Sequence, residues 1–151
     1  MTTPSHLFFS DDRAAAIEAI ASIASGRGWC NVIPEVVDDV PDLKVNVWGF
    51  WSSPGVPVAS YVTVAPKRGE GLPSSLGLLH SRGRLGRERI TLLLEGAPFT
   101  IRQDQRQRGL LLEVPVGAAA AQVLHVMCTL TESLCEFEMT GKWRLDLYRR
   151  S

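Results

Sequence analysis

The chain has 151 residues, of which 45% are hydrophobic and 21% are charged, and its 16 basic residues balance its 16 acidic residues. This size and composition are typical of one soluble globular domain with a single core, so residues 1–151 are expected to form one domain. They exclude a low-complexity or disordered chain, and the zero net charge gives no reason to expect an acidic or a basic partner.

The cysteines and the amino terminus predict the compartment. Cys30, Cys128 and Cys135 are an odd number without the spacing of a disulfide framework, which favours a reducing environment. The first twelve residues lack the positive and apolar regions of a signal peptide. No apolar stretch approaches the roughly 18 residues that cross a membrane. We therefore expect a cytoplasmic protein that does not associate with a membrane.

The first predicted element is an amphipathic helix. Ser10, followed by Asp11 and Asp12, has the residue types that cap and stabilise a helix start. The alanine-rich run after them repeats apolar residues at helical spacing, and Gly26 or Gly28 is expected to end the helix.

Three strands are predicted next. Residues 29–36 form a short apolar run in which Pro34 favours an edge position or an early end. Residues 43–51 and 56–65 flank a four-residue Ser-Ser-Pro-Gly loop with turn chemistry. We therefore expect these two runs to form a hairpin.

The middle of the chain is rich in glycine and arginine. Residues 66–87 are expected to form a loop, with one helical turn at 74–79 as an option. The apolar run 88–96 fits a buried strand and a short helix equally well.

The last third predicts a hairpin, a helix and a strand. Residues 99–103 and 109–116 flank a polar turn, and 117–137 carry apolar residues along one helical stripe. Residues 142–150 alternate apolar and polar side chains, as a strand does. Because helices and strands are segregated, we expect an α+β fold with a largely antiparallel sheet packed against an N-terminal and a long C-terminal helix.

The residues give little support to catalysis or metal binding. On the last helix, Cys128 and Cys135 are two turns apart, about 10 Å along the axis, which is too far for one zinc ion. His125 and Glu132 fall on the opposite side of that helix. No nucleophile elbow or nucleotide-binding glycine motif occurs. We expect no metal and no cofactor, although an enzyme with a site dispersed over loops stays open.

Two surfaces are candidates for binding. In the predicted hairpin, Trp48, Phe50 and Tyr61 gather on one face, and aromatic clusters are common at binding sites. The alternative is that the protein covers this face itself.

The second candidate surface is the arginine-rich run. Arg82, Arg84, Arg87 and Arg89 offer an alternative site for phosphates of nucleic acid or for an acidic protein face. No aromatic residue is interleaved with them, which argues against single-stranded nucleic acid. The other interpretation is a flexible, solvated loop whose charges keep the protein soluble.

The order of elements resembles that of class I type III secretion chaperones and the related YbjN-like proteins. Residues 92–130 carry the resemblance: an apolar segment, a glycine turn, a strand, a polar turn, a strand that ends at proline, and a helix. The resemblance implies a small non-enzymatic α+β protein, often a homodimer, that binds an extended segment of another protein.

The leading hypothesis is therefore a protein-binding module, chaperone-like in its use of the aromatic hairpin face or the sheet edge. An inhibitor of the immunity type fits the same features. The alternative is a nucleic-acid or nucleotide accessory protein that uses the arginine-rich loop.

Overall fold

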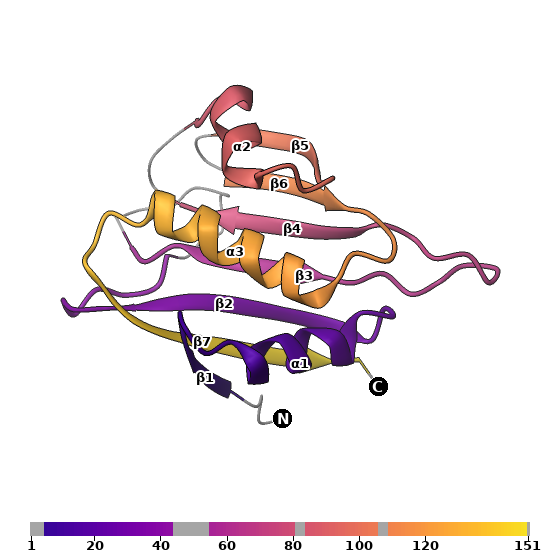
Figure 1. Cartoon of the computed structure of the whole chain (residues 1–151), viewed down its shortest axis with the longest axis horizontal. Helices are drawn as coiled ribbons and strands as arrows, with labels where there is room; N and C mark the ends of the chain where they lie inside the picture. The colour runs from indigo at the N-terminus through magenta and orange to yellow at the C-terminus, as the bar shows by residue number, and fades with distance from the viewer. Residues whose placement is uncertain (1–4, 44–54, 81–83, 106–108, 151) are drawn as a thin grey trace.

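The computed structural model describes residues 5–43, 55–80, 84–105 and 109–150. Within them, seven antiparallel strands form one sheet in the order β1-β7-β2-β3-β4-β6-β5, and three helices pack on one of its faces (Figure 1). The predicted α+β class is confirmed. The strands are β1 (Ser5–Phe9), β2 (Gly28–Val36), β3 (Val58–Val62), β4 (Ser74–Leu79), β5 (Thr100–Gln105), β6 (Gly109–Val114) and β7 (Met139–Arg149). The helices are α1 (Ala14–Ile23), α2 (Arg87–Leu94) and α3 (Ala120–Leu134).

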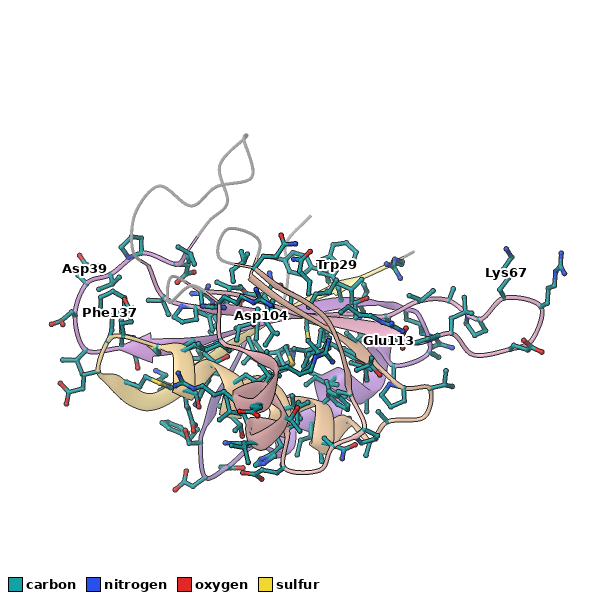
Figure 2. All side chains as sticks on the ribbon, turned by 90° about the horizontal axis from the view of Figure 1, so that it is seen from above. Trp29, Asp39, Lys67, Asp104, Glu113 and Phe137 are labelled. Carbon is teal, nitrogen blue, oxygen red and sulfur yellow. The ribbon has the colours of Figure 1, made fainter. Side chains whose placement is uncertain are left out.

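The core lies between the sheet and the helices. In β7, Trp143, Leu145 and Leu147 are buried, while the residues between them are only partly buried. Alternation of this kind places successive side chains on opposite faces of a strand. Figure 2 shows the consequence: the helices lie on one side of the sheet, and Trp29 lies on the other.

The long helix α3 confirms the predicted stripe. Its apolar residues face the sheet and are at most 1% exposed: Val123, Val126, Met127, Leu130 and Leu134. Cys128 is also fully buried. Helix α1 contributes Ala16, Ile20 and Ile23 to the same core. No helix within the described ranges is long and apolar enough to cross a membrane.

The start of the chain differs from the prediction. Residues 5–9 form β1, an edge strand that was not predicted from the sequence. Ser10 does not cap α1, which has Arg13 at its N-cap position and no side-chain cap. Instead, the Ser10 hydroxyl accepts a hydrogen bond from the indole Nε1–H of Trp143 at 2.8 Å. Ser10 therefore serves a tertiary contact rather than the local helix end.

The predicted 66–87 loop is wrong at residues 74–79, which form β4 and not a helical turn, so that β3 and β4 are the two strands of one long hairpin. The register that pairs Val58 with Leu79 continues to a bridge between Lys67 and Glu70. The turn residues Arg68 and Gly69 both have positive φ, 56° and 79°, as a two-residue type I′ turn requires. We call residues 63–73, which extend beyond the sheet, the hairpin arm.

The predicted 43–51/56–65 hairpin is not found in the described part of the chain. Residues 44–54 lie outside the described ranges. Of the second run, β3 pairs with β2 on one side and with β4 on the other, so neither of its edges is free for residues 46–49. The register that set Tyr61 beside Trp48 and Phe50 is therefore wrong.

The remaining elements resolve the ambiguities of the sequence. The run 88–96 is mostly helical, as α2, and β5 and β6 confirm the second hairpin. Pro34 does not place β2 at an edge, since β2 lies between β7 and β3. However, the pairing of β2 with β3 ends at Val32, and the register of β2 with β7 shifts just after Pro34. The proline therefore lies where β2 pairs with only one neighbouring strand.

Candidate functional site

Of the predicted aromatic face, Tyr61 is described by the structure, whereas Trp48 and Phe50 lie outside the described residues. Tyr61 is only 4% exposed and lies opposite Cys30 on the helix-covered face of the sheet. Burial raises the pKa of its hydroxyl, partly offset by a side-chain hydrogen bond with Ser74. Tyr61 is thus a core residue whose hydroxyl stays protonated.

The arginine-rich segment is built around a carboxylate. Asp104 of β5 accepts hydrogen bonds from the backbone N–H groups of Leu85 and Gly86 at 3.0 and 2.7 Å. These groups lie at the positive end of α2, where an anion is favoured. The Nε of Arg84 lies 3.9 Å from the same carboxylate. The side chain of Asp104 therefore already occupies the place where an external phosphate would bind.

Of the other predicted arginines, Arg87 lies in the wall of the same cavity as Arg84 and Asp104. Arg89 is exposed on α2, and Arg82 lies outside the described residues. The metal candidates are separated: His125 is exposed and contacts Glu95 at 3.2 Å, whereas Cys128 lies in the core. The described ranges contain no group of three His, Cys, Asp or Glu residues that could hold a metal ion.

Two buried thiols are expected to be unreactive. Burial raises the pKa of Cys30 and of Cys128 to about 12 in each case. Such a shift lowers the thiolate fraction at pH 8 about a thousand-fold. We expect iodoacetamide at pH 8 to add one group to the native protein, at the partly exposed Cys135. Intact-mass spectrometry would show it, with three additions in denaturant as the control. Fast addition of two groups to native protein would contradict the burial.

The two buried thiols make the stability of the fold depend on pH in a definite direction. Because the folded-state pKa values of Cys30 and Cys128 lie above the value of 9.0 of an exposed thiol, the folded state holds these protons more tightly than the unfolded state. The resulting stabilisation is complete below pH 9 and is lost as the pH rises from 9 towards 12.

The two edges of the sheet are built differently. At one edge, β5 carries the charged residues Arg102 and Asp104, and its register with β6 shifts between Ile101 and Gln103. Charges and bulges are the devices by which proteins keep an edge strand from pairing with another chain. The β5 edge is therefore protected.

The β1 edge has none of these devices. Its sequence Ser-His-Leu-Phe-Phe contains no proline, lysine or acidic residue, and its register with β7 is continuous over five residues. No described strand pairs with its second side, although the backbone N–H and C=O groups of Phe9 bond to Asp12 in the turn that follows. Phe8 points into the core and stacks on Trp143, with ring centroids 6.0 Å apart. Leu7 and Phe9 point away from the core and are 60% and 53% exposed. β1 thus combines an open edge with a small apolar surface.

A cavity of about 270 Å³ adjoins β1 and has Leu7 in its wall. Arg144 lies in the same wall and is held by Asp42 at 2.8 Å and by Asp146 at 3.1 Å. Burial acts to lower the pKa of the Arg144 guanidinium, but these two carboxylates more than offset it and raise the pKa above its usual value. The guanidinium therefore stays charged and fixes the loop that holds Asp42 against β7.

A sequence signal for this site exists but is weak. The run Leu7-Phe8-Phe9 is short and apolar with aromatic residues, which suits a strand, yet five residues provide too little periodicity to identify one. What makes β1 a candidate is its place at the sheet edge, and this depends on its pairing with β7, more than 130 residues away.

Comparison with known proteins finds no family model that matches this chain, and no curated protein or solved structure that is similar to it. The resemblance to class I type III secretion chaperones stays a prediction based on the order of elements. The site is therefore defined by its own geometry: an unprotected, apolar edge strand beside a charged cavity.

Proposed function

We propose that this chain is a non-enzymatic, chaperone-like protein-binding module that takes an extended segment of another protein along the free edge of β1. The observation that carries the proposal is the contrast between the two edges: β5 is charged and bulged, whereas β1 is regular, contains no acidic residue, lysine or arginine, and carries exposed Leu7 and Phe9. An added strand would pair with the backbone of β1 and cover both side chains.

The partner is expected to be a segment of about five residues with apolar side chains at alternate positions. A strand laid along β1 directs every second side chain to the outer face of the sheet, where Leu7 and Phe9 are spaced by one residue. Main-chain hydrogen bonds supply affinity in this mode, and the alternate side chains supply selectivity. A chaperone-like role follows if the segment belongs to a protein that is not yet folded.

The test selects peptides from a displayed random library and measures their affinity by fluorescence anisotropy. We expect Phe9→Lys to weaken the selected peptide about ten-fold or more, because the variant removes a buried aromatic contact and adds a charge to the edge. Leu92→Lys is the matched control, since Leu92 is 77% exposed on α2, which lies at the opposite end of the molecule from β1 (Figure 1). It should leave the affinity unchanged.

Hydrogen exchange identifies the surface that is used. In the complex, those amides of β1 that bond neither to β7 nor, as the Phe9 amide does, to Asp12 should become protected. The proposal fails if no peptide is selected, if protection appears elsewhere, or if Phe9→Lys binds like the wild type. Protection of β1 that rises with protein concentration in the absence of peptide would assign the edge to a second copy of the chain instead.

A further inference from the structure

A second cavity lies at the base of the hairpin arm, on a different part of the surface from β1. Its volume is about 250 Å³. Three segments surround it: the arm itself, the end of α1 with Ala24 and Ser25, and residues 115–118 between β6 and α3. Figure 1 shows these segments converging on the side of the molecule from which the arm projects, and Figure 2 shows Lys67 at the far end of the arm.

The walls of this cavity are held by close backbone contacts. A Cβ atom at Gly26 would lie 2.3 Å from the Cα of Ala65, and one at Gly71 would lie 2.6 Å from a methyl group of Val116. The guanidinium of Arg150 donates to the carbonyl oxygens of Gly26 and Thr63 at 3.2 and 2.8 Å. The base of the arm is thus fixed against both neighbouring segments, as in a preformed ligand site.

The lining has an apolar rim and two hydroxyl groups among its innermost residues. Val64, Leu72 and Val116 are 39%, 37% and 60% exposed and form part of the rim. Tyr61 and Ser74 are 4% and 8% exposed, and their side chains are hydrogen-bonded to each other. Once they are bonded to each other, the two hydroxyls can still donate one hydrogen bond to a ligand and accept one from it.

We infer that this cavity binds a small, largely apolar molecule that carries one hydroxyl group. The hydroxyl would bond to the Tyr61–Ser74 pair, and the hydrocarbon part would cover Val64, Leu72 and Val116. A few placed polar groups within an apolar lining are typical of sites for small molecules. A charged ligand is disfavoured because the cavity lining contains no charged side chain among the described residues.

The test uses benzyl alcohol and its matched hydrocarbon, toluene, in an NMR titration of the methyl groups of the full chain. We expect benzyl alcohol to shift the methyl resonances of Leu72 and Val116 in a saturable manner. Tyr61→Phe keeps the ring but removes the hydroxyl, and should weaken benzyl alcohol about 2–10-fold while leaving toluene unchanged. Phe9→Lys should change neither ligand, because the cavity is independent of the β1 edge.

Several results would overturn the inference. They are the absence of saturable shifts at Leu72 and Val116 in the wild type, shifts that centre on another surface, and equal effects of Tyr61→Phe on both ligands. The wild-type titration decides the site even if Tyr61→Phe fails to fold. In that case Ser74→Ala provides the second test of hydroxyl recognition. It should weaken the binding of benzyl alcohol and leave the binding of toluene unchanged.

Discussion

Replacing Trp143 with alanine is expected to lower the free energy of unfolding by about 3–5 kcal/mol. Trp143 is fully buried in β7, stacks on Phe8 and donates its indole N–H to Ser10. The substitution removes the largest of the fully buried side chains and leaves a cavity between the sheet and α1. Urea denaturation followed by far-ultraviolet circular dichroism measures the loss. Trp143→Ala would also loosen β1, because Phe8 packs on the ring that the substitution removes.

Two further variants separate packing from hydrogen bonding at this site. Ser10→Ala leaves the indole N–H of Trp143 without its acceptor and should cost about 1–3 kcal/mol. Leu92→Ala removes an apolar side chain that is 77% exposed, and it should change stability by less than about 0.5 kcal/mol. If Trp143→Ala were as mild as Leu92→Ala, the assignment of the core to this face of the sheet would be wrong.

Gly28→Ala is expected to cost about 3 kcal/mol, at the upper end of the range for overpacking. A Cβ atom at Gly28 would lie 1.9 Å from the carbonyl oxygen of Tyr148, which belongs to the neighbouring strand β7. The obstacle is backbone and not a flexible side chain, so the β2–β7 pairing itself must shift. Gly28 also exchanges hydrogen bonds with the hydroxyl of Thr63, at 3.2 and 2.6 Å, and these would be disturbed as well.

Gly77→Ala is the matched control, because Gly77 also lies in a central strand of the same sheet and neither glycine has positive φ. A Cβ at Gly77 meets its nearest described atom at 3.9 Å, an ordinary contact. Alanine restricts the unfolded chain more than glycine, so this variant should be neutral or stabilising by about 0.5 kcal/mol. Equal losses for Gly28→Ala and Gly77→Ala in thermal denaturation would rule out the proposed close approach of β2 and β7.

The sequence predicted the elements whose periodicity is long or regular. Residues 120–134 repeat apolar side chains over four turns, and β7 alternates them at Trp143, Leu145 and Leu147, so each pattern identifies its element without help from the rest of the chain. The polar turn between β5 and β6 likewise indicated their hairpin. Together these elements were sufficient to predict the α+β class.

The sequence did not predict the parts that depend on pairing between distant residues. The run 74–79 was interpreted as an optional helical turn within a loop rich in glycine, proline and basic residues, yet it alternates buried and partly buried side chains in the middle of the sheet. Aromatic residues near a turn suggested a binding face that includes Tyr61, whereas the pairing of β3 with β2 and β4 turns Tyr61 into the core.

Local periodicity therefore determined which segments form helices and regular strands, because the spacing of apolar side chains along the backbone is a property of the segment alone. Only the tertiary structure decided which strands lie at the edges, which glycines touch a neighbouring backbone, and which hydroxyls are buried. Ser10 illustrates the difference: its residue type suits a helix cap, but burial of the Trp143 indole N–H gives that hydroxyl a partner 133 positions away. The β1 edge and the cavity at the base of the hairpin arm arise in the same way, from segments that the fold brings together.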